Sequence, residues 1–347
     1  MKWIFSHQTA LEIWRKAPAR SIETSTKLRN MKPPVKPIDT KELKIEKLQN
    51  LSLPLHVLVG SLNARKASKS LSCHISLAVI PEWSFIRMPS GLIVSSPELC
   101  FLQMAGELTF IDLIVLGYEL CGTYRLDRED NPVKGFRNDL PLTNTGKLKS
   151  YADKAVNLKG CKNARRAISF IADGSASPME TILTMLLTLP YRFGGYGFPK
   201  PLLNYRIDAP LSTDDSYSDF PTLITIDSTG IKSSIPMNEL INKSKFSCDL
   251  YWHDSKVAVE YDSDAFHVGP DRIEKDAIRR NTLTSAKITM ITASRRQVTD
   301  AKKLRELAEA LSKLLGKRLN YPVKEFALRQ ANLMDKLLPN KSVEKKE

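Results

Sequence analysis

Acidic side chains are closely spaced in residues 246–263, where two apolar runs, FSCDLYW and VAVEYDS, flank the segment HDSK. The composition of HDSK is typical of a turn, so the stretch is predicted to form a β-hairpin. A four-residue loop places Trp252 across from Val257, and the same register places Asp249 directly across from Glu260. Asp262 follows two residues later on the same side. The pattern therefore predicts three carboxylates on one small patch of a sheet.

Carboxylates that face one another across a sheet repel, because their β-carbons lie only ~5 Å apart. The repulsion is relieved by a raised pKa of one acid, by a buried cation from another segment, or by a bound metal ion. We favour the metal, because hard carboxylate oxygens suit Mg²⁺ or Mn²⁺. The opposite side of the hairpin, with Leu250, Trp252 and Val259, is predicted to face the core.

The order of these residues resembles the PD-(D/E)XK nuclease superfamily, which has an Asp on one strand, Glu-x-Asp on the next, then a His and a basic helix. It is most similar to the very-short-patch-repair-like endonucleases, with a run E-x-D-G-x-x-H followed by D-x-x-R. The matching residues here are Glu260, Asp262, His267, Asp276 and Arg279, with His267 one position later than in that run. Ser263 stands in place of the Gly, and Asp262 replaces the superfamily's Lys, a change that the branch shares. The resemblance covers residues 177–296.

This resemblance implies a restriction-endonuclease-like core, with a mixed sheet flanked by helices, and a Mg²⁺- or Mn²⁺-dependent endonuclease that hydrolyses DNA phosphodiester bonds. The implied metal ligands are Asp249, Glu260 and Glu180. Asp262 is expected to hold a second water or to orient His267. His267 is expected to accept the proton of the attacking water, since an imidazole titrates near neutrality.

Glu180 also has a simpler explanation in the sequence. Residues 177–180, SPME, form the start of a predicted helix, and Glu180 at its third position completes a capping box with Ser177. We retain both interpretations, a metal ligand and a helix cap.

A basic helix is predicted to begin at Pro270 and to reach about residue 285. Its predicted nucleic-acid-binding residues are Arg272, Lys275, Arg279 and Arg280. Arginines that hold phosphates beside carboxylates that hold an ion are the groups that phosphodiester hydrolysis requires. The alternative is a solvated helix face with no ligand.

The composition of the chain favours an anionic partner. Its 347 residues carry a formal charge of +14, and 42% of them are hydrophobic. DNA is the expected partner, while RNA, a second copy of the chain and a protein from the same locus are left open. Five cysteines without a C-x-x-C pair indicate reduced thiols. The N-terminus lacks a signal core, and no apolar run is long enough to span a bilayer, so a cytoplasmic protein without a membrane partner is expected.

The predicted fold class is α/β, or more strictly α+β, in four parts. Residues 1–50 are expected to be an N-terminal helix and a basic linker, which is either a solvated tether or an arm along DNA. Residues 51–172 form a smaller α+β domain, residues 173–320 the endonuclease-like domain, and residues 321–347 a C-terminal helix and a disordered basic tail. His74, within a predicted strand of the second part, is interpreted as a structural histidine.

Residues 94–124 weakly resemble AbiE-type antitoxins, although a helical core without further meaning explains the same apolar spacing. The function expected from the whole sequence is a DNA endonuclease in phage defence, a mobile element or repair. The competing function is a non-catalytic DNA-binding transcriptional regulator, or an antitoxin-like protein that retains a nuclease fold.

Overall fold

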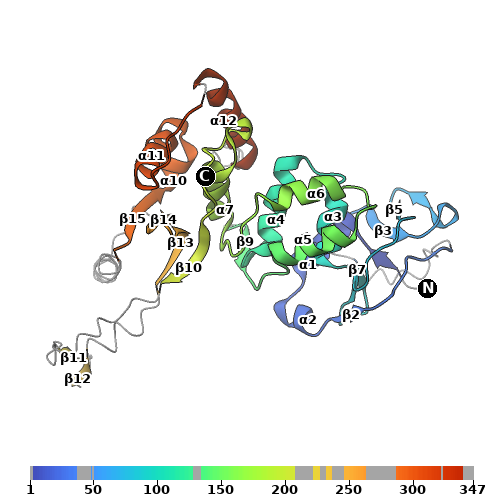
Figure 1. Cartoon of the computed structure of the whole chain (residues 1–347). Coiled ribbons are helices and arrows are strands. Elements are labelled where there is room, and N and C mark those ends of the chain that lie inside the picture. The colour runs from blue at the N-terminus through green and yellow to red at the C-terminus, as the bar shows by residue number, and fades with distance from the viewer. Residues whose placement is uncertain are drawn as a thin grey trace, which may run out of the picture. The chain divides into compact units, whose positions relative to one another are not determined.

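The computed structural model of the chain describes residues 3–36, 48, 51–127, 134–207, 222–226, 232–236, 246–262, 287–321 and 323–338. These residues divide into two compact units, Met1–Thr181 and Ile182–Glu347. Each unit combines helices with a sheet, so the predicted mixed α/β class is confirmed (Figure 1). None of the helices in the described ranges is both long and apolar enough to cross a membrane.

The first unit contains a seven-stranded sheet with the order β2-β6-β7-β1-β3-β5-β4. Its strands are β1 (Ile4–Phe5), β2 (Thr26–Leu28), β3 (Leu55–Val59), β4 (Ala67–Ser68), β5 (Leu71–Ile75), β6 (Phe85–Arg87) and β7 (Ile93–Ser95). β1 pairs with β7 in parallel and with β3 in antiparallel orientation. β3 and β5 are parallel, with Leu58 paired with His74.

The N-terminal segment differs from the prediction of a separate helix and linker. β1 is the middle strand of the sheet, and β2 pairs with β6 at its edge. Along the chain, α1 (His7–Lys16) and α2 (Ala19–Glu23) connect β1 to β2. Ile4 and Phe5 are fully buried, but a two-residue strand is too short to produce a readable period in the sequence. Of the predicted linker, residues 37–47 and 49–50 lie outside the described residues.

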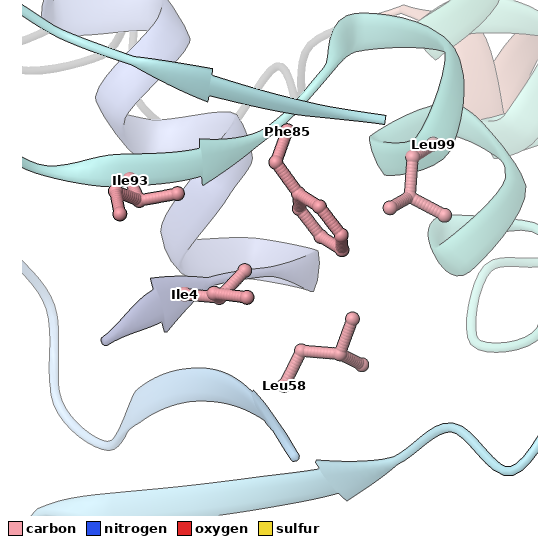
Figure 2. Packing of buried hydrophobic residues seen from close by; sticks show 5 residues of the cluster. All are labelled: Ile4, Leu58, Phe85, Ile93 and Leu99. Carbon is pink, nitrogen blue, oxygen red and sulfur yellow. The ribbon is translucent and has the colours of Figure 1, made fainter. Parts of the chain in front are cut away.

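Four helices pack beside this sheet: α3 (Pro97–Met104), α4 (Phe110–Cys121), α5 (Thr145–Lys154) and α6 (Cys161–Ile168) (Figure 1). Ser96 and Thr109 cap the first two, because each side chain accepts a hydrogen bond from a backbone N–H of the first turn. Figure 2 shows how the helices meet the strands: the side chains of Ile4, Leu58, Phe85, Ile93 and Leu99 converge in one buried cluster.

A buried ion pair joins α1 to α4. The Arg15 Nε and Nη2 atoms donate hydrogen bonds of 2.8 and 2.6 Å to the two carboxylate oxygens of Glu119. The same carboxylate accepts the Leu126 N–H at 3.2 Å. Leu126 belongs to β8 (Tyr124–Leu126), which pairs with β9 (Phe136–Asn138). Both strands of this small hairpin are too short for an alternating pattern to be visible in the sequence.

The second unit contains a mixed four-stranded sheet with the order β10-β13-β14-β15. Its strands are β10 (Leu202–Ile207), β13 (Phe246–Trp252), β14 (Val257–Asp262) and β15 (Thr289–Ser294). The first two pairings are antiparallel and the last is parallel. A separate antiparallel ladder joins β11 (Thr222–Ile226) and β12 (Lys232–Pro236).

The helices of the second unit begin with most of α7 (Pro178–Thr188) and end with α12 (Val323–Leu337). Residues 301–314 form one helix, α11 (Ala301–Leu314), and the shorter α10 (Arg295–Thr299) precedes it. They are separate because Asp300 leaves the helical conformation and caps α11, accepting the N–H groups of Lys302 and Lys303.

An aromatic cluster connects α12 to the short helix η4 (Tyr191–Phe193). The Tyr321 and Phe326 rings lie 4.1 Å apart, and both contact Tyr191. The predicted C-terminal helix is therefore part of the second unit. The residues of the predicted disordered tail from 339 onward lie outside the described ranges.

Candidate active site

The β13–β14 hairpin has the predicted turn and the predicted register next to it. Trp252 pairs with Val257 and Leu250 with Val259, on either side of the turn at residues 253–256. One step further along this register, Asp249 lies across from Glu260. At that point the Asp249 side chain meets the opposite strand, and its Oδ2 atom accepts the Tyr261 N–H at 2.7 Å. The hairpin therefore brings Asp249 next to the acidic end of β14.

The face that carries the acids changes character along the strands. Near the turn, this face is apolar and shielded from solvent, because the paired residues Tyr251 and Ala258 are both buried. The Tyr205 ring on β10 stacks against Tyr251 at a centroid distance of 5.1 Å. Toward the other end, Asp249, Glu260 and Asp262 are only half-buried. This acidic patch is thus shielded on one side and still reachable by solvent and small ligands.

The opposite face of the hairpin packs into the core, as predicted. Cys248, Leu250 and Val259 are fully buried. The Trp252 indole is anchored as well, because its Nε1 donates a 2.7 Å hydrogen bond to the Pro199 carbonyl. β15 lies on the other side of β14 and pairs Thr292 with Glu260. The pairings with β13 and β15 therefore fix the position of β14, the strand that carries Glu260 and Asp262.

The structure places Glu180 in the first turn of α7, where it acts as a helix cap. Its backbone N–H donates to the Ser177 Oγ at 3.2 Å, and its Oε2 accepts the Ala176 N–H at 2.9 Å. The sequence predicted the Ser177 N–H as the second partner, one residue later. Glu180 belongs to the first unit and the acidic patch to the second, so its role as a metal ligand stays a prediction.

The other predicted site residues lie outside the described residues. They are His267, Arg272, Lys275, Arg279 and Arg280, all within residues 263–286. The general-base role of His267 and the phosphate-binding role of the basic helix therefore stay predictions.

Sequence reasoning missed a second cluster of chemically active side chains, in the first unit. His74 Nε2 lies 2.8 Å from His56 Nδ1, and the His7 and His74 rings stack with centroids 3.5 Å apart. Glu107 Oε1 lies 3.9 Å from His7 Nε2 and 3.7 Å from His74 Nδ1. The hydrogen bond of His74 agrees with its interpretation as a structural histidine, but the cluster extends beyond it.

Burial dominates the electrostatics of this cluster. It lowers the pKa of His7 to about 2, with smaller contributions from His74, His56 and the Lys159 ammonium. Burial likewise lowers the pKa of His74 to about 4, assisted by His56, Lys159 and Arg65. Both rings are therefore neutral at pH 7. The members are far apart in the sequence, so only the pairing of β1, β3 and β5 reveals the cluster.

The cysteines offer no activated nucleophile. All five are free thiols, four of them buried and Cys73 partly exposed. Burial raises the pKa of Cys100 from 9.0 to about 12, which lowers its thiolate fraction about 10³-fold. We expect a maleimide to label native Cys73 first and Cys100 far more slowly, whereas all five react in guanidinium. Peptide mapping by mass spectrometry measures this order, and rapid labelling of native Cys100 would contradict it.

Comparison of the chain with family models, curated proteins and solved structures finds no match in any of the three.

Proposed function

We propose that the chain is a metal-dependent endonuclease that hydrolyses DNA, with its active site at the acidic patch. The observation that carries this proposal is the 2.7 Å hydrogen bond from the Tyr261 N–H to Asp249 Oδ2, which joins Asp249 to the residue after Glu260 at the half-buried end of the hairpin. Two opposed carboxylates are costly in a sheet unless a cation accompanies them.

The donor atoms of the patch fit Mg²⁺ or Mn²⁺. Carboxylate oxygens are hard ligands, and Mg²⁺ is usually held by one or two carboxylates together with waters and substrate phosphate oxygens. Among the described residues, the acidic patch does not form a group of three ligand atoms within 4.8 Å of one another. We therefore assign the ion to Asp249 and Glu260, with Asp262 as an outer residue. A bound ion would lower the pKa of a water and neutralise charge on the phosphate.

The surrounding residues support a defined role for each acid. The Tyr261 N–H fixes the orientation of the Asp249 carboxylate, as outer hydrogen bonds do for metal ligands. Asp262 lies two residues beyond Glu260 and precedes His267, the proposed proton acceptor. The net charge of +14 provides the long-range attraction that a polyanionic substrate needs.

The test is incubation of the purified chain with supercoiled plasmid, single-stranded DNA and RNA, each with Mg²⁺, Mn²⁺ or EDTA. Cleavage of DNA that requires metal and stops with EDTA supports the proposal. Preferential cleavage of RNA would change the substrate class. Binding of DNA without turnover under every condition would favour the regulator or antitoxin-like function instead.

Asp249→Asn separates the charge of this residue from its hydrogen bond, since the amide oxygen still accepts the Tyr261 N–H. Without metal, the variant is expected to melt at the same or a higher temperature, because the repulsion across the hairpin is relieved. Saturating Mg²⁺ at about 100 times its Kd stabilises the wild type by about 2.7 kcal/mol, and the variant by much less. Calorimetry with and without metal measures both effects.

The matched control is Asp254→Asn, in the turn of the same hairpin, where the side chain is fully exposed. This variant should respond to Mg²⁺ as the wild type does. Equal metal-induced shifts in the wild type and in Asp249→Asn would show that the patch is not an ion site.

A further inference from the structure

Three imidazoles and one carboxylate meet at a single point in the first unit. His7 begins α1 immediately after β1, His56 lies on β3, and His74 lies on β5. Glu107 follows α3 in the connection to α4. The ligand atoms of His7, His74 and Glu107 all lie within 4.8 Å of one another. Four separate elements therefore converge on this cluster.

One ring nitrogen of His7 and one ring nitrogen of His74 lie near the Glu107 carboxylate. His7 Nδ1 lies 2.9 Å from Ser6 Oγ, which leaves Nε2 toward Glu107. His74 Nε2 lies 2.8 Å from His56 Nδ1, which leaves Nδ1 toward Glu107. Hydrogen bonding of the remote nitrogen is usual for metal-binding histidines. Here the near nitrogen of each ring lies within 4 Å of the same Glu107 oxygen.

The backbone of His7 provides an independent observation. Its φ of 49° is in the left-handed region, which a non-glycine residue adopts at an energetic cost. The Gln103 Oε1 holds this conformation by accepting the His7 N–H at 3.1 Å. Such conformations are concentrated at ligand sites, where they aim a side chain. Here the strain directs the His7 ring toward His74 and Glu107.

We propose that His7 Nε2, His74 Nδ1 and the Glu107 carboxylate bind one Zn²⁺ ion. Two imidazoles and one carboxylate are a donor set for Zn²⁺, whereas Mg²⁺ prefers oxygen atoms alone. Ligand atoms around a tetrahedral Zn²⁺ lie about 3.3 Å apart, given bonds of ~2.0 Å. The observed distances of 3.7 and 3.9 Å are slightly longer, and the His7 and His74 rings, which stack at 16° to one another, must turn for both lone pairs to meet at the ion. His56 does not bind the ion but orients His74.

This site is distinct from the acidic patch in both chemistry and location. Three protein ligands leave a fourth coordination position for water or for a ligand group. The exposed fractions of the three side chains indicate the side from which solvent reaches that position. The Glu107 side chain is 35% exposed and that of His74 21%, whereas His7 is 11% exposed.

The test uses the full chain, stripped with a chelator and titrated with Co²⁺, whose visible absorption reports nitrogen and oxygen ligands in a tetrahedral site. One equivalent of Co²⁺ is expected to produce the bands, and Zn²⁺ but not Mg²⁺ to displace it. Glu107→Gln and His74→Ala are expected to abolish the bands. His56→Ala should retain the site with about 10- to 100-fold weaker affinity.

Two controls make the outcome unambiguous. His253→Ala removes a histidine that is 68% exposed in the β13–β14 turn, and it should leave the titration unchanged. Asp254→Ala, which removes an exposed carboxylate from the same turn, should also leave it unchanged. Glu107→Gln is the decisive variant, since its partly exposed side chain can be replaced without a cavity, and circular dichroism checks its fold. The proposal is overturned if folded wild type gives no Co²⁺ bands, or if the bands persist in Glu107→Gln and His74→Ala.

Discussion

Replacing Asp249 or Glu260 with Ala is expected to reduce metal-dependent DNA cleavage by at least about 10³-fold, because a bound ion contributes several kcal/mol to the transition state. Asp249 contacts β14 at Tyr261, the residue after Glu260, so we expect both acids to hold the proposed ion. DNA binding should persist, since neither acid contacts phosphate except through the metal. Initial rates on plasmid and a filter-binding assay measure the two properties separately.

The matched control for these variants is Asp254→Ala, which removes an exposed carboxylate from the same hairpin and should cleave at the wild-type rate. Glu260→Gln provides a second test in which the size of the side chain is unchanged. Undiminished cleavage in Asp249→Ala or Glu260→Ala would remove these residues from the site. Loss of cleavage together with loss of DNA binding would point to a folding defect and not to a missing ligand.

Glu119→Ala is expected to lower the free energy of unfolding by about 3–5 kcal/mol, because it leaves a largely buried guanidinium without its counter-charge. The Glu119 side chain is only 3% exposed and accepts two hydrogen bonds from Arg15. Burial lowers the pKa of Arg15, but the Glu119 carboxylate more than offsets this, and the net shift is upward. Differential scanning calorimetry should record a fall in Tm of roughly 6–20 °C for a unit of this size.

The Arg29–Glu82 ion pair provides the comparison. It lies on the surface of the same unit, with side chains 63% and 49% exposed. Glu82→Ala should therefore change the free energy of unfolding by less than about 1 kcal/mol. If Glu82→Ala and Glu119→Ala lose similar amounts of unfolding free energy, the location of Glu119 between α1, α4 and β8 does not strengthen its ion pair.

Elements defined by local patterns were predictable from the sequence. The β13–β14 hairpin follows from two apolar runs and a turn, and its register follows from the length of that turn. The α3 helix follows from Ser96 and Pro97, which mark its start. The sequence therefore predicted that the acidic residues of the patch lie near one another. The hydrogen bond from Tyr261 to Asp249 was not, because it depends on where the ladder ends.

Elements defined by distant pairing were not predictable. β1 is too short to show alternation, and its place between β3 and β7 depends on partners far along the chain. The histidine cluster was missed for the same reason. His74 taken alone has no signal beyond a polar residue in a strand, and its relation to His7 and Glu107 exists only after the sheet has formed.

The central position of β1 also determines when the first unit can fold during synthesis. Ile4 and Phe5 are synthesised long before their parallel partners, Ile93 and Val94. The middle of the sheet therefore stays incomplete until translation has passed β7, and at about 5–20 residues per second this wait lasts several seconds. During that interval, the apolar β1 segment and β3 are exposed to chaperones. Because β1 and β7 are far apart in the chain, we also expect this unit to refold more slowly than a helical domain of similar size.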